Sequence, residues 1–307
     1  MQLKKLSAVV ALSCGLLAVS AYAGVTREEA GNGELVPTGK GWGEHHAQGQ
    51  ANPNGNAKPT SGNGIFYHGG PVMLGTVNVY YIWYGNWSGN SATNILTDLA
   101  NNIGGSPYFN INTTYYNGSN QHVSNSVAYA GSTTDNYSRG TTLTDSGVQG
   151  VVADAINSGR LPKDTNGVYF VLTSQDVNES SGFCTQYCGW HTHGTIAGSD
   201  IKYSFVGNAA RCISSCAAQT IGPNGNPGAD GMASVVSHEL EEAATDPDLN
   251  AWYDRQGAEN ADKCAWTFGT TFSSGGALAN VHLGTRDFLI QRNWVNAAGG
   301  YCSMQYP

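Results

Sequence analysis

The residues best suited to chemistry in this chain are His238, Glu239 and Glu242. They lie in a stretch from Asp230 to Pro247 that predicts a helix, because Asp230 can cap its amino end and Pro247 ends it. On a helix, residues four apart lie one above the other, with Cβ atoms about 5–6 Å apart. The imidazole of His238 and the carboxylate of Glu242 could therefore hold one metal ion between them.

The pattern is His-Glu-x-x-Glu, which differs at one position from the His-Glu-x-x-His helix motif of zinc peptidases. In that motif the first glutamate is the general base, so the same role is expected of Glu239. Glu242 replaces the second histidine, and its additional negative charge would raise the pKa of a metal-bound water. A hydrolase with this site should be slow or work at higher pH. The oxygen-rich ligand set would also suit Ca2+ as an alternative to Zn2+.

Catalytic zinc takes three protein ligands, so a third must come from elsewhere in the chain. Glu259 is the first candidate, because Glu259-x-x-Asp262 is similar to the helix-borne glutamate that completes the site of thermolysin-like enzymes. Asp262 is then expected to accept a hydrogen bond from His238 and fix its ring. The competitors of Glu259 for the third position are Asp246, His191 and Asp248.

The first 23 residues have the composition of a secretory signal peptide. Two lysines, Lys4 and Lys5, precede an apolar run from Leu6 to Val19 and a small-residue cleavage site that ends at Ala23. No other apolar run is long enough to span a membrane. We therefore expect a protein with a bacterial type of signal that is secreted, extracellular or periplasmic, and not attached to the membrane after cleavage.

The charge balance narrows the classes of partner. The formal net charge is −8, and removal of the signal peptide with its two lysines makes it −10. An acidic protein is a poor match for nucleic acid or an anionic membrane surface, and it suits cation binding.

Six cysteines follow the signal peptide, and an even number in an exported chain favours three disulfides. Cys264 is expected to pair with Cys302, which would tie the C-terminal segment to the stretch after the His-Glu helix. The other four leave local pairing, crossed pairing and a cysteine zinc site open; they are Cys184, Cys188, Cys212 and Cys216.

The remaining chain divides into a leader and one domain. Residues 24–64 contain too few large apolar side chains to offset the entropy of ordering, which predicts a flexible leader. Residues 65–307 are expected to form one loop-rich, disulfide-stabilised domain. Its expected elements are strands at 76–84, 168–173, 201–206 and 286–294, helices at 92–103 and 144–156, and an antiparallel hairpin region at 106–139. This order indicates an α/β (α+β) fold with the His-Glu helix packed under a mixed sheet.

Several segments of residues 65–307 together resemble the phosphate-induced, EXORDIUM-like family of secreted proteins. The clearest are Tyr67-His-Gly-Gly-Pro-Val72, Cys188-Gly-Trp-His191, Asp230-Gly-Met232, His238-Glu-Leu-x-Glu242 and Glu259-x-x-Asp262-x-Cys264. The resemblance implies an extracellular, cell-wall or matrix location and a zincin-like fold around the His-Glu helix. The family carries no settled enzymatic activity.

Two functions are consistent with these observations. The first is a secreted zinc metallohydrolase, most simply a peptidase, with Glu239 as the base and His238, Glu242 and Glu259 on the metal. The second is a non-catalytic extracellular module that keeps a zincin-like scaffold and binds a cell-wall polymer or a receptor through a Tyr- and Trp-rich surface. Its partner would be a polymer or peptide rather than nucleic acid.

Overall fold

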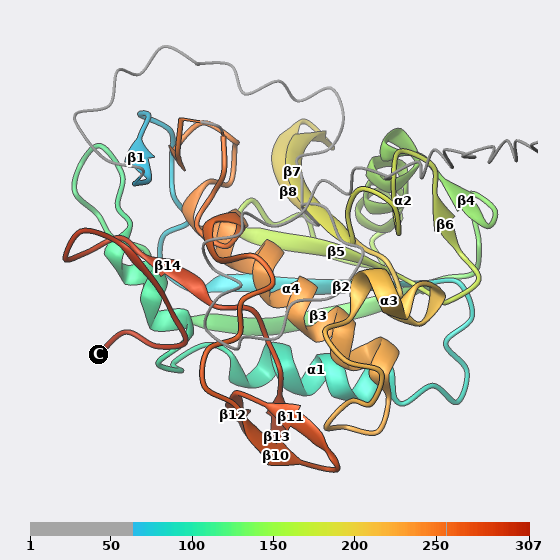
Figure 1. Ribbon diagram of the computed structural model, residues 1–307. Coiled ribbons are helices and arrows are strands. Elements are labelled where there is room, and N and C mark those ends of the chain that lie inside the picture. Colours follow the sequence, from blue (N-terminus) through green and yellow to red (C-terminus); the bar gives the residue numbers. More distant parts are fainter. Residues whose placement is uncertain (1–63, 256) are drawn as a thin grey trace, which may run out of the picture.

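The computed structural model describes residues 64–255 and 257–307, so the expected signal peptide and leader lie outside the described residues. A five-stranded mixed sheet forms the centre of the molecule (Figure 1). Its strand order is β3-β2-β5-β8-β7, and the first four strands are parallel. The edge strand β7 is antiparallel to β8. The strands are β2 (Val77–Tyr84), β3 (Val127–Asp135), β5 (Gly167–Thr173), β7 (Gly189–Ile196) and β8 (Ser199–Val206).

The inner strands are the most apolar segments of the chain because helices cover both faces of the sheet. Every residue of β5 is buried, and β2 exposes only Asn78 in part. β-branched and aromatic side chains dominate both strands, as expected for parallel strands that solvent reaches on neither face. The expected central strand at 76–84 is therefore confirmed.

Helices α1 (Ala92–Asn102) and α4 (Pro227–Thr245) pack side by side on one face, and α2 (Asp145–Asn157) lies on the other (Figure 1). Strand β7 separates the two layers. The Cα of Gly189 packs against Val235 of α4, whereas that of Gly194 packs against Gln149 of α2. The short helix α3 (Ile213–Cys216) lies beside α4.

Five two-stranded ribbons and three 3-10 turns complete the described chain. The ribbons are β1 (Phe66–Tyr67) with β9 (Trp252–Tyr253), β4 (Thr142–Leu143) with β6 (Asn178–Glu179), β10 (Phe272–Ser274) with β11 (Ala277–Ala279), β12 (Val281–Leu283) with β13 (Arg286–Phe288), and β14 (Asn293–Val295) with β15 (Tyr301–Ser303). The 3-10 turns are η2 (Phe109–Thr114), η3 (Ala209–Arg211) and η4 (Asp262–Cys264). One hydrophobic core runs through the domain from Ile65 to Val295.

Two expectations about strands are wrong. Residues 106–139 do not form an extended antiparallel hairpin region: one isolated antiparallel bridge joins Tyr116 to His122, and the strand that follows, β3, pairs in parallel with β2. The crossover through α1 returns the chain in the same direction, and this makes the pairing parallel. Residues 286–294 are not one edge strand, because β13 and β14 belong to separate ribbons.

Helix α4 begins earlier than expected. Asn226, and not Asp230, is its N-cap, and the Asn226 side chain accepts a hydrogen bond from the Ala229 N–H at 3.1 Å. Pro227 occupies the first turn, where its missing N–H costs nothing. The helix ends at Thr245, two residues before Pro247, as expected.

All six cysteines of the domain form disulfides. The expected bond between Cys264 and Cys302 is confirmed. The pairing of the others is crossed, with Cys184 bound to Cys212 and Cys188 to Cys216. These two bonds join the loop before β7 to η3 and α3, so the start of β7 is covalently tied to the layer that contains α4.

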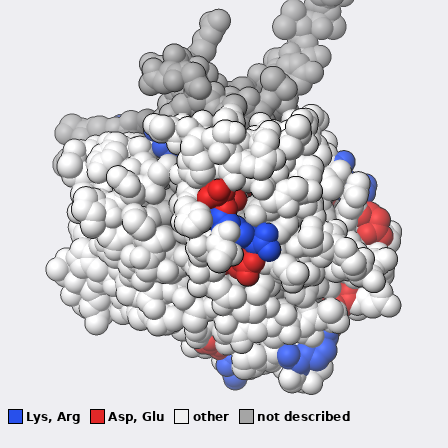
Figure 2. Space-filling view, turned by 90° about the horizontal axis from the view of Figure 1, so that it is seen from below, with Lys and Arg blue, Asp and Glu red and all other residues white. Residues whose placement is uncertain are grey.

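Charged side chains are sparse on the face that Figure 2 shows. Lys, Arg, Asp and Glu are scattered over a mostly neutral surface, and those near the centre form a mixed acidic and basic group. This agrees with a chain in which only 12% of the residues are charged. The surface in this view presents no large field of one sign.

Candidate metal centre

Helix α4 places His238, Glu239 and Glu242 in the middle of the molecule, because the small side chains of its amino-terminal half let it pack closely against its neighbours. A Cβ atom on Gly228 would lie 2.7 Å from the Cβ of Ala210, and one on Gly231 would lie 2.7 Å from the Cys216 carbonyl oxygen. Both distances are shorter than real contacts, so these glycines let α4 approach η3 and α3 closely. Every residue of α4 after Pro227 is buried.

The predicted pair on α4 is formed. The Nε2 atom of His238 lies 3.0 Å from Oε1 of Glu242, one helical turn later. Asp262 of η4 completes a first group, since its Oδ1 is 3.4 Å from His238 Nε2 and its backbone N–H donates to Glu242 Oε1 at 3.1 Å. One ligand atom from each of these three residues lies within 4.8 Å of the other two. Asp262 is thus within reach of a cation held by the pair, and it lies at the same ring nitrogen of His238 as Glu242 does.

A second group shares Glu242. The Nδ1 atom of His191, on β7, lies 3.4 Å from Glu242 Oε2 and 3.5 Å from Glu239 Oε2. Glu242 therefore contacts one histidine through each carboxylate oxygen. Glu259 lies on the other side of the His191 ring, with 3.7 Å between its Oε1 and the Nε2 atom of His191. The two groups form one continuous buried cluster that joins β7, α4 and the segment before η4.

Two other candidates for the third ligand lie differently. The Oδ1 atom of Asp246 accepts hydrogen bonds from the backbone N–H groups of Asn250 and Ala251, both at 2.6 Å, so this carboxylate closes the turn after α4. Asp248 lies in a separate group beside His193, whose Nδ1 is 3.8 Å from its Oδ1. Strand β7 therefore directs His191 and His193 to two different groups, and Asp248 is not brought to His238.

The group around His193 has its own counter-charge. The Nζ atom of Lys202 lies 2.6 Å from Asp200 and 3.4 Å from Asp248, and His193 lies 2.7 Å from Asp200. An ammonium already balances these carboxylates, and this geometry is typical of an ion-pair network that ties β7 and β8 to the turn after α4.

The electrostatics of the cluster follow from its burial. Burial raises the pKa of Glu239 to about 8. Burial and neighbouring carboxylates, Glu242 first, raise the pKa of Glu259 well above its usual range. Burial alone would also raise the pKa of Glu242, but His238 and His191 outweigh it and lower that pKa. Burial would lower the pKa of His191, and the carboxylates of Glu239 and Glu242 instead raise it to about 10.

This donor set fits a divalent cation. Two imidazoles and the carboxylates of Glu239, Glu242, Glu259 and Asp262 supply nitrogen and oxygen ligands of the kinds that zinc accepts. Both carboxylate oxygens of Glu239 are buried and accept no hydrogen bond from the part of the chain that the structure describes. A buried carboxylate is costly unless it is protonated, paired or bound to a metal, and a divalent cation is one of the ways in which these oxygens could be satisfied.

Tyr253 of β9 lies beside the cluster although no sequence pattern marks it as a site residue. Its hydroxyl is buried and makes no hydrogen bond within residues 64–255 and 257–307. Burial, with the charges of Asp246 and Glu259, raises the pKa of this hydroxyl, so the tyrosine faces the cluster. The ring of His68 stacks on it, with 3.6 Å between the ring centroids. Nothing in the local spacing of these residues indicates the contact, which depends on the pairing of β1 with β9.

In the part of the chain that the structure describes, no helix combines the length and the apolar character needed to cross a membrane.

Comparison with known proteins gives a consistent family. The family described as "Phosphate-induced protein 1 conserved region" matches residues 65–282. Protein EXORDIUM-like 5 of Arabidopsis thaliana is 33% identical over 271 residues, which cover 74% of each chain. Protein EXORDIUM-like 3 of the same plant is 32% identical over 278 residues and covers 77% of this chain and 82% of its own. Protein PHOSPHATE-INDUCED 1 of Nicotiana tabacum is 29% identical over 224 residues, which cover 61% of this chain and 66% of its own. No solved structure matches.

Proposed function

The chain belongs to the phosphate-induced protein 1 family, and we propose that it is an exported zinc-dependent hydrolase of peptide bonds. The observation that carries the proposal is the position of Glu242 between His238 and His191. Glu239 lies beside the imidazole of His191. A general base next to a pair of metal-ligating side chains is the arrangement that metal-assisted hydrolysis needs. The mixed sheet with α4 packed against its edge strand β7 supports the proposal of a zincin-like scaffold.

Each residue has a role in this proposal. His238 and Glu242 hold the cation with Asp262 as the third ligand. Glu259, the first candidate from the sequence, is the alternative, because it contacts His191 and not His238. Zinc, when bound, supplies Lewis acidity that polarises the scissile carbonyl. Glu239 accepts a proton from the attacking water and returns it to the leaving amine. Because Glu242 adds a negative charge where a second histidine would be neutral, the enzyme should be slow or need alkaline pH, and Ca2+ is the alternative cation.

Export is part of the proposal. The composition of residues 1–23 is that of a signal peptide, and three disulfides are consistent with an oxidising compartment. The protein would act outside the cytoplasm, in the periplasm or the extracellular space.

A second candidate, a non-catalytic module that binds a cell-wall polymer, is favoured by two observations. His238 and Glu239 are 0% exposed, so the cluster is enclosed and a substrate would need an opening motion. Partly exposed aromatic rings surround Trp252, with ring centroids 5.2 Å away for Tyr67 and 4.9 Å for Tyr116. Such rings could stack on sugars. In this case the cation would only stabilise the fold.

Metal analysis and peptide cleavage separate the two. The purified protein would be analysed for bound zinc and calcium, then assayed on casein and a peptide library as wild type, Glu239→Gln and Asp154→Asn. The hydrolase proposal expects stoichiometric zinc in all three proteins and cleavage lost only in Glu239→Gln. Asp154 is the control because its half-exposed carboxylate pairs with Arg139 on the protein surface. Bound metal without cleavage in any protein would favour the binding module, and absence of metal would overturn the metal centre itself.

A further inference from the structure

Helix α4 carries two consecutive buried glutamates that point to different sides. Glu242 contacts the histidines of the metal centre, whereas Glu241 faces away from them. The Glu241 carboxylate accepts a hydrogen bond from the side-chain amide of Asn293 on β14. Its backbone carbonyl accepts one from the Asn260 side chain, with 3.3 Å between the atoms. Consecutive helical residues differ by about 100° around the axis, so adjacent side chains can serve separate sites.

Three asparagines enclose Glu241. The Oδ1 atom of Asn112, in η2, lies 3.2 Å from Asn260 Nδ2 and 3.3 Å from Asn293 Nδ2. Glu241 and the three asparagines are all 0% exposed. We call this set the Glu241 cage; its members are Glu241, Asn112, Asn260 and Asn293. The cage joins α4 to three segments that are far apart in the sequence.

The cage fixes the segment that supplies the acids of the metal centre. Asn260 lies between Glu259 and Asp262, and its own carbonyl accepts a hydrogen bond from the Trp294 N–H at 3.1 Å. Both its side chain and its main chain are therefore held. Asp262 in turn donates its backbone N–H to Glu242, and its Oδ2 accepts from the Glu259 N–H at 3.3 Å. A shift of Asn260 would move both acids relative to His238.

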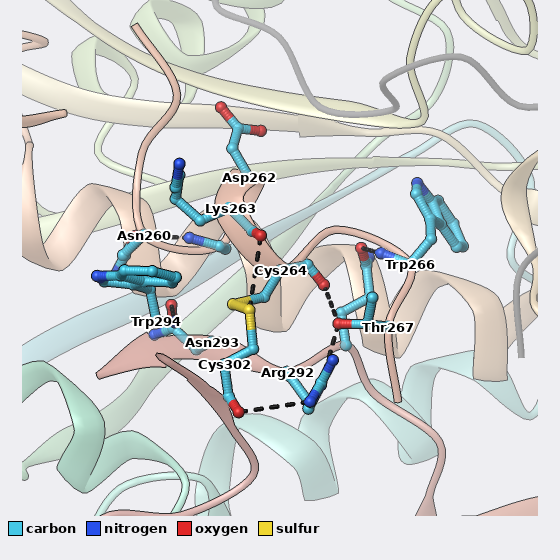
Figure 3. Close-up of a disulfide and its surroundings, with 12 residues drawn as sticks. Asn260, Asp262, Lys263, Cys264, Trp266, Thr267, Arg292, Asn293, Trp294 and Cys302 are labelled. Atoms are coloured by element: carbon cyan, nitrogen blue, oxygen red, sulfur yellow. Dashed lines mark hydrogen bonds between the residues drawn. A yellow bond between two sulfur atoms is a disulfide. The ribbon is translucent and has the colours of Figure 1, made fainter. Parts of the chain in front are cut away.

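The opposite end of this segment is held by a disulfide. Figure 3 shows Cys264 bonded to Cys302. Asn260, Asp262 and Lys263 precede Cys264 in the sequence, and Asn293 and Trp294 of β14 lie beside them. Glu241 secures the start of the segment and the disulfide secures its end.

The chemistry of the cage argues that it does more than fill space. A carboxyl group in a fully buried position costs desolvation free energy, and apolar side chains of the same volume often stabilise a core at least as well. Such polar networks are useful where they impose one arrangement on the segments they join. Here the joined segments are α4, which carries His238 and Glu242, and the segment that carries Glu259 and Asp262.

We propose that Glu241 is a positioning residue for the metal centre. Its carboxyl group fixes Asn293 on β14, and β14 holds the acids of residues 259–262 at the His238–Glu242 pair through the hydrogen bond from the Trp294 N–H to the Asn260 carbonyl. This inference rests on the proposed cation binding. It adds a residue that touches neither cation nor substrate, and it assigns separate tasks to the adjacent glutamates.

Cation affinity is the measurement that tests this role. Zn2+ affinity would be measured by competition with a chromophoric chelator for wild type, Glu241→Leu and Glu179→Leu, and Co2+ absorption would report the ligand geometry. Groups that orient metal ligands typically contribute a factor of about 10–100 in affinity, so Glu241→Leu, which cannot accept the Asn293 hydrogen bond, should bind Zn2+ more weakly by that factor, with an altered Co2+ spectrum. Glu179→Leu removes another buried carboxyl group, one that bonds Ser181 and Tyr187, and it should leave both readouts unchanged.

A rescue variant separates positioning from general loss of stability. Glu241→Gln keeps an oxygen that can accept the Asn293 hydrogen bond, and it should recover most of the affinity lost in Glu241→Leu. Wild-type affinity in a folded Glu241→Leu protein would overturn the inference alone. Failure of Glu241→Gln to recover affinity would also count against it. If the wild type binds neither Zn2+ nor Ca2+, the proposed metal centre fails and this inference fails with it.

Discussion

The Oε2 atom of Glu242 lies 3.4 Å from Nδ1 of His191, so a residue of the central helix contacts the edge strand of the sheet inside the core. The same carboxylate contacts His238 through its other oxygen, and both histidines are buried. Glu242 thus joins the two halves of the cluster through its own side chain. Loss of its charge should therefore affect the whole centre.

Glu242→Gln is expected to weaken Zn2+ binding by roughly 100-fold or more, because an amide keeps the shape but is a poor metal ligand. The measurement is chelator competition at neutral pH. Glu179→Gln is the matched control, since Glu179 is also buried but bonds Ser181 and Tyr187 instead. Equal affinities in the two variants would remove Glu242 from the ligand set.

Asp246 should make the stability of the metal-free protein depend on pH. Burial raises its pKa from an ordinary value of 3.8 to about 6. Since the folded state holds the proton more tightly, the stabilisation is complete below pH 3.8 and is lost as the pH rises through about 6. The two values differ by about two pH units, which corresponds to about 3 kcal/mol.

The test is thermal unfolding in EDTA between pH 4 and pH 7 for wild type and Asp246→Asn. Asparagine can still accept the hydrogen bonds from Asn250 and Ala251, so the turn should persist. We expect the wild type to lose stability relative to the variant across this range. Parallel pH curves for the two proteins would contradict the expectation.

The local contacts of the site could be predicted from the sequence, whereas for the long-range part the sequence named candidate residues without their positions. His238 and Glu242 are one helical turn apart, so their contact follows from the helix alone. The approach of His191 depends on how β7 packs on α4, and no spacing in the sequence specifies that. The choice between Glu259 and Asp262 depends likewise on the direction of the turn that begins at Asp262.

In the fold, too, the local features could be predicted from the sequence and the long-range pairing could not. The apolar runs of β2 and β5 identify buried strands, but the parallel pairing of β3 depends on the crossover through α1. The expected start of α4 at Asp230 is wrong because Asn226 caps the helix and the turn before Asp230 contains Gly228, a weak helix former. Tertiary packing of Gly228 and Gly231 against η3 and α3 outweighs their low helix propensity.

Gly189→Ala should destabilise the fold and move β7 away from α4. An added Cβ would lie 2.6 Å from Val235 Cγ1, 2.8 Å from the Phe205 carbonyl oxygen and 3.2 Å from Glu239 Oε1. Overpacking of this kind typically costs about 1–3 kcal/mol, and His191, two residues later, would move with the strand. Urea unfolding gives the free energy, and Zn2+ affinity should fall in parallel.

Gly194→Ala on the same strand is the control. Its added Cβ would meet mainly the end of the flexible Gln149 side chain, which can move aside. A loss of stability as large as that of Gly189→Ala would show that any substitution in β7 is harmful, and the specific contact with α4 would then explain nothing.

Removal of the Cys264–Cys302 disulfide should weaken both the fold and the metal centre. The bond closes a loop with a sequence separation of 38 residues, and a native disulfide of this kind typically contributes about 2–4 kcal/mol. Cys264 ends the turn that begins at Asp262, so the double variant Cys264→Ala, Cys302→Ala should also bind Zn2+ more weakly. Urea unfolding and chelator competition measure the two effects separately.

The comparison is the double variant Cys184→Ala, Cys212→Ala, which removes a disulfide between the loop before β7 and the layer of α4, leaving residues 259–264 intact. It should cost stability with a smaller loss of Zn2+ affinity, and equal losses of affinity in the two double variants would contradict a specific role for the Cys264–Cys302 bond.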